Sequence, residues 1–258
     1  MVMIFSLNNA SYSYDGKKNV FENISFSLKK GETLCILGPN GIGKSTLIKC
    51  IANVFKLKNG TILIGNKNIS SMSRTEVAQR IGYVPQADMS VFSFSILDFV
   101  LLGRAPHLPF FSSPSEKDII IAENAIINVG ISHLMDRPVT EISGGEKQLA
   151  LIARALAQEP DILLLDEPTS HLDFGNQVRI LNLIDKLSRQ GTSVIMSTHY
   201  PDHAFMSQKN VAIMLENDFI AQGTAEEVIT KENMSLAYGI EVAIDHVSSV
   251  KRKVCLPL

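Results

Sequence analysis

The sequence predicts an α/β fold, in which a parallel β-sheet is flanked by helices and joined by an antiparallel β subdomain and an inserted α-helical subdomain. Beyond residue 143, helix and strand patterns alternate, as they do in chains that build parallel sheets. The strand runs 162–165 (ILLL) and 194–196 (VIM) do not alternate apolar with polar residues, which is expected when helices cover both sheet faces. A further strand, 32–38, runs directly into a glycine-rich loop and a helix.

The N-terminal part indicates a β hairpin. Residues 4–14 and 20–28 alternate apolar with polar side chains, and an Asp-Gly pair at 15–16 separates the two runs. The apolar residues of 44–55 recur at helical spacing and predict a helix there, and strands are expected at 61–65 and 81–86.

The character of the chain changes between residues 87 and 142. Segments 95–102 and 116–129 are typical of helices, whereas Pro106, Pro109 and Pro114 predict a loop between them. We therefore interpret 87–142 as a helical subdomain inserted into a catalytic α/β core of residues 1–86 and 143–258, all within one domain.

The composition excludes several classes of protein. Lys and Arg number 24 against 26 Asp and Glu, and this net charge of -2 argues against a nucleic-acid partner, which would favour a basic chain. The three cysteines lack metal-ligand spacing and are expected to be reduced thiols, with Cys35 and Cys50 in the core. Neither a signal peptide nor an apolar run of about 18 residues is evident, so no membrane span is expected.

The glycine-rich loop matches the pattern G-x-x-x-x-G-K-S between a strand and a helix. Glycines let backbone N–H groups turn toward phosphate oxygens, and the helix N-terminus favours an anion. We expect Lys44 to reach the β- and γ-phosphates, the Ser45 hydroxyl to bind Mg²⁺ and Thr46 to support the α-phosphate. The loop alone leaves open the choice between ATP and GTP, and between transport, signalling and DNA repair. The expected nucleotide-binding residues of the loop are Gly38, Asn40, Gly41, Gly43, Lys44, Ser45 and Thr46.

Polar residues at the ends of later strands complete a predicted catalytic set. Asp166 follows the apolar run 162–165 and is expected to be the second anchor for Mg²⁺, and Glu167 the general base that poises the attacking water. We expect Gln86 to reach the γ-phosphate and the metal, and His199 to hydrogen-bond the γ-phosphate. Taken alone, Gln86 is also compatible with an ordinary loop residue and His199 with a structural histidine.

The run ISGGEKQLALIARAL (142–156), just before DILLLDEP (161–168), resembles the signature of the ATP-binding-cassette (ABC) family. The resemblance extends over nearly the whole chain and implies a P-loop ATPase with a RecA-like sheet that binds ATP and Mg²⁺. It also implies a head-to-tail homodimer, in which Ser143 and Gly145 contact ATP held by the second copy and Asp173 lies near the interface. Tyr14 matches the aromatic residue that stacks on adenine, and Tyr12 is the alternative.

The chain departs from the usual family pattern at a few positions. Ile142 replaces a leucine, Lys147 and Leu149 stand where arginines are common, and His171 stands where alanine is frequent. None of these side chains is expected to hold phosphate, so the resemblance still implies a competent catalyst.

The helical insert resembles that of ATPases serving iron-siderophore, haem and vitamin B12 importers, most clearly in GRAPH (103–107) and TSHLD (169–173). Molybdate and tungstate importers are similar too. This likeness implies a peripheral protein at the cytoplasmic face of the cell membrane, whose partners are an integral membrane permease dimer and, indirectly, a solute-binding protein. His107 is not expected to contact a metal or solute. Two alternatives remain: a soluble ABC ATPase of repair, translation or cluster assembly, and a regulatory nucleotide-binding module without turnover.

Overall fold

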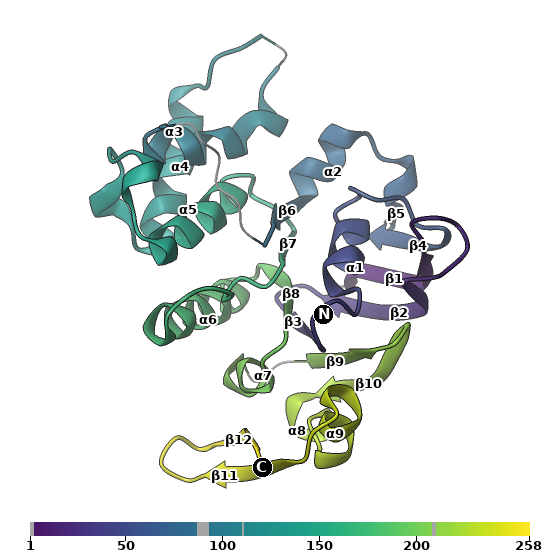
Figure 1. Ribbon diagram of the computed structural model, residues 1–258. Helices are drawn as coiled ribbons and strands as arrows, with labels where there is room; N and C mark the ends of the chain where they lie inside the picture. Colours follow the sequence, from purple (N-terminus) through teal and green to yellow (C-terminus); the bar gives the residue numbers. More distant parts are fainter. Residues whose placement is uncertain (1–2, 87–92, 110, 208–209) are drawn as a thin grey trace.

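The computed structural model describes residues 3–86, 93–109, 111–207 and 210–258 (Figure 1). Its centre is a six-stranded sheet of order β10-β9-β3-β8-β7-β6, in which every neighbouring pair is parallel except the edge pair β9–β10. The predicted α/β fold is therefore confirmed. These strands are β3 (Thr33–Leu37), β6 (Ile81–Val84), β7 (Ile162–Leu165), β8 (Ser193–Thr198), β9 (Asn210–Leu215) and β10 (Asp218–Thr224).

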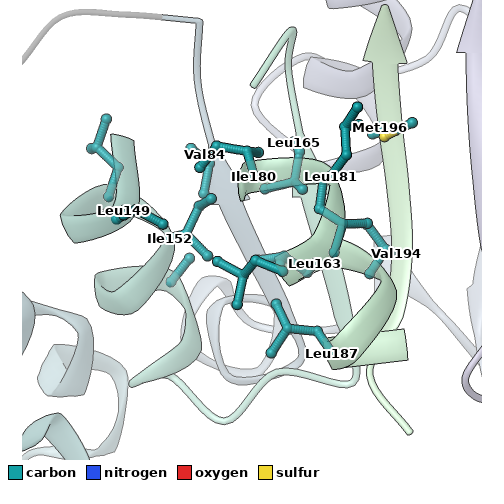
Figure 2. Close-up of a cluster of buried hydrophobic side chains, with 14 of the residues drawn as sticks. Val84, Leu149, Ile152, Leu163, Leu165, Ile180, Leu181, Leu187, Val194 and Met196 are labelled. Atoms are coloured by element: carbon teal, nitrogen blue, oxygen red, sulfur yellow. The ribbon is translucent and has the colours of Figure 1, made fainter. Parts of the chain in front are cut away.

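Each face of this sheet belongs to a different hydrophobic cluster. Leu163 and Leu165 of β7 pack with helices α5 (Gly144–Leu156) and α6 (Phe174–Arg189), as Figure 2 shows. The alternate residues Ile162 and Leu164 pack on the opposite face with α1 (Lys44–Ile51) and the N-terminal strands. Because both faces are covered, the strand is apolar at every position, which explains its lack of alternation.

The N-terminal strands form a second, antiparallel sheet of order β2-β1-β4-β5. Its strands are β1 (Met3–Tyr12), β2 (Phe21–Lys29), β4 (Asn59–Ile64) and β5 (Lys67–Asn68). The β1–β2 hairpin is as predicted, with the Asp-Gly pair in its connection, but β1 ends earlier than expected, at Tyr12, and residues 13–20 separate the two strands. The Asp15 carboxylate accepts hydrogen bonds from the amides of Lys17 and Lys18, which orders this loop.

Helix α1 is shorter than the predicted 44–55 and ends at Ile51. Asn53 adopts a left-handed φ of 57°, and the amides of Val54 and Phe55 both bond back to the carbonyl of Lys49. Phe55 leaves the helix and stacks on Tyr12 at 5.5 Å between ring centroids. Phe55 is therefore apolar because it packs against the antiparallel sheet, and not because it belongs to the apolar face of α1.

The inserted region contains α3 (Ile96–Leu101), η2 (Leu102–His107), α4 (Glu116–Val129), η3 (Ser132–Leu134) and η4 (Val139–Glu141), and follows η1 (Ile69–Ser71) and α2 (Arg74–Arg80). Its predicted start at 87–92 lies outside the described residues. Ser95 caps α3 by accepting from the Asp98 amide. Buried Arg104 donates to Asp118 of α4 and to the Ala157 carbonyl beyond α5. This network joins the inserted helices to α5, with which α3 and α4 pack (Figure 1).

The described C-terminal part of the chain adds further helices and strands, whereas for the stretch from residue 241 the sequence predicted only a solvated basic patch at 251–253. They are α7 (Pro201–Ser207), α8 (Ala225–Val228), α9 (Lys231–Tyr238) and the antiparallel pair β11 (Val242–Val247) and β12 (Arg252–Pro257). Across the described part of the chain, every helix is too short or too polar to cross a bilayer.

Candidate functional site

The glycine-rich loop connects the carboxyl end of β3 to the N-terminus of α1. Gly41 and Gly43 have left-handed φ values of 80° and 111°, a region that other L residues rarely adopt. A Cβ on Gly38 would lie 2.4 Å from the Met214 carbonyl oxygen, so this position is closed to side chains. The backbone therefore needs glycine at these positions for its own geometry.

Lys44 is buried at the centre of the loop. Its Nζ donates to the carbonyl oxygens of Gly38 and Pro39, both at 2.8 Å, and lies 3.4 Å from Oε1 of Glu167. Burial lowers the pKa of Lys44, while the charge of Glu167 opposes that shift. The side chain is therefore held in place by two carbonyls and a carboxylate of the protein itself.

Asp166 and Glu167 follow β7, where the sequence placed them. One carboxylate oxygen of Asp166 accepts from the hydroxyls of Ser45 and Ser197, both at 2.8 Å. Burial raises the pKa of Asp166, and these two hydroxyl hydrogen bonds oppose the shift. Ser197 also accepts from the Glu167 amide at 2.9 Å, so one serine on β8 positions both acidic residues.

The other predicted catalytic side chains all contact the carboxylate of Glu167. Gln86 donates to its Oε2 at 3.0 Å, and His199 Nδ1 lies 3.4 Å from the same oxygen. Gln86 lies two residues beyond the end of β6, and His199 directly beyond β8. Glu167 itself has a left-handed φ of 46°, a strained conformation of the kind found at functional sites. Lys44, Gln86 and His199, which are distant from one another in sequence, thus converge on one carboxylate.

Tyr14 and Tyr12 have different environments. Tyr12 ends β1 and is 8% exposed within the core, whereas Tyr14 lies beyond the strand and is 65% exposed. The Tyr14 hydroxyl is 2.9 Å from the Thr46 hydroxyl, beside the glycine-rich loop. The alternating run predicted a strand as far as residue 14, but β1 ends at Tyr12, so Tyr14 lies in the following loop. Burial leaves Tyr14 as the aromatic residue available to a ligand.

Two adjoining cavities of about 590 and 550 Å³ lie over the loop. They share Tyr14, Val20 and Gly41, and the second reaches Lys44 and Glu167. Together they extend from Asn217 and Tyr14 to Lys44 and Glu167. The second cavity is lined by Tyr14, Val20, Asn40, Gly41, Gly43, Lys44, Ser45, Thr46, Gln86 and Glu167.

The signature segment lies elsewhere on the chain. Ser143 is the N-cap of α5, and its hydroxyl pairs with Glu146 in a capping box. Asp173 caps α6 through the Asn176 amide at 2.9 Å, and the Asn176 side chain donates to Asp173 at 2.7 Å. The described linings of the two cavities include neither Ser143, Gly145 nor Asp173.

Comparison with known proteins shows the family of this chain. The family model described as ABC transporter matches residues 21–170, more than half of the chain. The chain belongs to the ABC transporter family. An uncharacterized ABC transporter ATP-binding protein of Haemophilus influenzae is 39% identical over 237 residues, covering 92% of this chain and 90% of the relative. This ABC protein is therefore an ATPase, and ATP is its nucleotide.

Relatives with named solutes are similar over the same length. A probable iron chelatin transport ATP-binding protein of Helicobacter pylori is 35% identical, covering 92% of this chain and 93% of the relative. The molybdate import ATP-binding protein MolC of Haemophilus influenzae is 36% identical, covering 90% and 87%. The solved inward-facing conformation of a putative metal-chelate type ABC transporter has a TM-score of 0.88 and 32% identity, covering 100% of this chain and 98% of that one.

Sequence reasoning did not identify several residues that support the site of this ABC ATPase. His203 is 5% exposed, and its Nδ1 lies 3.1 Å from the hydroxyl of Thr198 and 3.3 Å from that of Thr169. Burial, and then the neighbouring His199, lowers the pKa of His203 to about 4, so this imidazole is neutral at pH 7. Through these two contacts, His203 connects the segment that follows Glu167 with the end of β8, directly before His199. The sequence did not predict a metal or solute contact for His107. In the structure, its Nε2 atom bonds the Gln158 carbonyl at 2.9 Å.

Proposed function

We propose that this chain is the ATP-hydrolysing subunit of an ABC importer, which powers uptake of a metal chelate or a metal oxyanion through a separate membrane permease. The chelates considered are iron-siderophores, haem and cobalamin. The observation that carries this proposal is the match over the whole chain to a putative metal-chelate type ABC transporter, at a TM-score of 0.88. Relatives named for iron chelatin and molybdate transport support the same class of solute.

The geometry supports a distinct role for each residue around the cavities. Tyr14, exposed at the rim, stacks on adenine. Lys44 turns from its two loop carbonyls toward the β- and γ-phosphates. Glu167 accepts a proton from the attacking water, while Gln86 and His199 hold the γ-phosphate region, since both side chains already meet the Glu167 carboxylate.

The donor set of the site fits Mg²⁺. Ser45 and Asp166 bring a hydroxyl and a carboxylate within 2.8 Å of each other, and oxygen ligands are those that this hard cation prefers. Burial of Asp166 leaves an acidic group with few water contacts, which a cation stabilises. Ser45, Asp166 and the amide oxygen of Gln86 would hold the ion, which supplies charge neutralisation at the phosphates.

A head-to-tail homodimer explains why the signature lies apart from the cavity. Ser143 and Gly145 stand at the N-terminus of α5, where amides favour an anion, yet they are outside the described lining of the chain's own phosphate cavity. A second copy would bring these amides, with Asp173 beside them, over the ATP of the first. The two sites would then close together upon ATP and open after hydrolysis.

Replacing Gly145 with alanine tests the signature segment. A Cβ there would lie 2.5 Å from Cγ of Asn176, the residue that holds Asp173, so the overpacking is expected to displace both segments. We expect ATP hydrolysis to fall about tenfold or more in a phosphate-release assay, with ATP binding to the isolated chain retained.

The double variant Gly145→Ala/Asn176→Ala is the matched comparison, since it removes the side chain that the new methyl meets. Partial recovery of hydrolysis relative to Gly145→Ala is expected. An equal loss with and without Asn176 would contradict the steric explanation and indicate that the methyl blocks the anion directly.

As an importer subunit, the chain is a peripheral protein at the cytoplasmic face of the cell membrane. There it binds an integral membrane permease dimer, and through that dimer it acts indirectly with a solute-binding protein. The inserted helices α3 and α4 supply the docking surface in this proposal. Their attachment to α5 through Arg104 supports a mechanical link between the permease and the signature segment.

The importer proposal is tested by isolating the tagged chain from detergent-solubilised membranes of its host and identifying what co-purifies. We expect a permease and, after reconstitution in vesicles, ATP-dependent uptake of one of four solutes: ferric siderophore, haem, cobalamin or molybdate. A Glu167→Gln complex is the negative control. Recovery of the chain only with ribosomal, repair or cluster-assembly proteins would contradict the proposal and favour a soluble ABC ATPase.

A further inference from the structure

The C-terminal segment contacts the turn that carries His199. Tyr238, the last residue of α9, donates its hydroxyl hydrogen to the His199 backbone carbonyl at 2.9 Å. A second contact lies three residues further along the chain, where the Cys255 amide of β12 donates to the Asp202 carboxylate, in the first turn of α7, at 3.0 Å. Figure 1 shows β12 of the C-terminal hairpin close to α7, on which it packs. The segment after residue 230 therefore contacts both the His199 backbone and the first turn of the helix that follows it.

Tyr238 is rigidly placed for this contact. Helix α9 is capped by Thr230 and ends at Gly239, which adopts the left-handed conformation with φ 70°. Its residues Met234 and Ala237 are buried in the core. Burial raises the pKa of Tyr238, so the phenol keeps its proton and remains a donor at neutral pH.

Among the described residues, the side chain of His199 has no hydrogen bond that fixes its direction. It is 24% exposed, and its Nδ1 lies 3.4 Å from Glu167 but makes no aligned hydrogen bond within the described part of the chain. The ring of Tyr200 packs against it at 4.0 Å between centroids. Because so little holds the imidazole directly, its direction depends on the backbone of the turn, and the Tyr238 hydroxyl is bonded to the backbone of His199 itself.

We propose that Tyr238 is a positioning residue for hydrolysis, which holds the His199 backbone so that the imidazole faces Glu167 and the γ-phosphate. This inference rests on the proposed role of His199. It gives the C-terminal segment a part in the reaction, because removal of one hydroxyl, 39 residues away along the chain, frees the turn that carries the catalytic imidazole.

The first test is Tyr238→Phe in the full chain, assayed for steady-state phosphate release over a range of Mg-ATP concentrations. The hydrogen bond is of ordinary strength, so we expect kcat to fall about fivefold. KM and the affinity for ATP are expected to stay unchanged, because Tyr238 is outside the described lining of the cavities. Lys253→Ala is the matched control: it removes the ion pair of β12 with Glu226 of α8, a contact of the same segment away from His199.

The second test places Tyr238→Phe in a His199→Ala background. A positioning role predicts that the phenylalanine then changes the residual rate less than twofold, because the residue it acts through is gone. Hydrogen–deuterium exchange of the peptide spanning residues 198–206 is expected to be faster in Tyr238→Phe than in wild type and in Lys253→Ala.

Three results would overturn the inference: an unchanged kcat, an equal fold-loss in both backgrounds, or unchanged exchange over residues 198–206. Its failure is separable from that of the proposed site. If His199→Ala loses hydrolysis while Tyr238→Phe does not, only the positioning role fails. If His199→Ala hydrolyses ATP at the wild-type rate, the proposed role of His199 fails, and the positioning role with it.

Discussion

Replacement of Glu167 with glutamine is expected to lower the rate of ATP hydrolysis by about 10²–10⁴-fold, the usual contribution of a general base. The amide keeps the size of the side chain and its contact with Gln86, but it cannot accept a proton from water. Loss of a negative charge 3.4 Å from Lys44 also favours the incoming phosphates, so ATP binding is expected to persist.

This variant also tests the dimer. ATP that binds but is not hydrolysed should hold two copies together, which size-exclusion chromatography with light scattering would detect as an ATP-dependent dimer. The control is Glu116→Gln, an exposed carboxylate in the first turn of α4. Near-normal hydrolysis by Glu167→Gln would contradict its role as base, and an ATP-loaded variant that stays monomeric at high concentration would contradict the sandwich.

Replacement of Lys44 with methionine is expected to abolish hydrolysis and weaken ATP binding by about 100-fold or more. The change removes the charge that meets the phosphates and leaves Glu167, which is 8% exposed, without its buried cation. We expect the free energy of unfolding of the empty protein to fall by about 1–3 kcal/mol. Titration with ATP and chemical denaturation measure the two effects.

The double variant Lys44→Met/Glu167→Gln separates the two effects. It removes both charges of the buried pair, so stability is expected to recover while ATP binding stays weak. Lys117→Met, an exposed lysine of α4, controls for the loss of a positive charge. Retention of wild-type ATP affinity in Lys44→Met would exclude a phosphate-binding role for this lysine.

Much of the site was predictable because its motifs are local. The loop from Gly38 to Thr46 needs a strand before it, a helix after it and glycines at positive φ, and all three conditions appear in one short stretch. Asp166 and Glu167 were predictable for a similar reason, since polar residues that follow a wholly apolar strand lie at the edge of a covered sheet. Their roles as metal anchor and base remain proposals.

The supporting residues were not predictable, because their partners are distant in sequence. Ser197 meets Asp166, His203 meets Thr169, and Tyr238 meets the His199 backbone. Serine, histidine and tyrosine at such positions are compatible with many local structures. Only the packing of β7 beside β8, and of the C-terminal segment beside α7, brings these groups to hydrogen-bonding distance.

The sequence by itself determined the α/β fold class, the family and the nucleotide loop, since each depends on periodicity or on residues adjacent in the chain. The tertiary structure alone decided that Tyr12 is buried and Tyr14 exposed, that Phe55 leaves its helix to stack on Tyr12, and that the connection between β1 and β2 is long. It also joined the C-terminal segment to His199. The physical reason is that burial and hydrogen-bond geometry are properties of the assembled fold, in which residues far apart in the chain compete for the same space and the same partners.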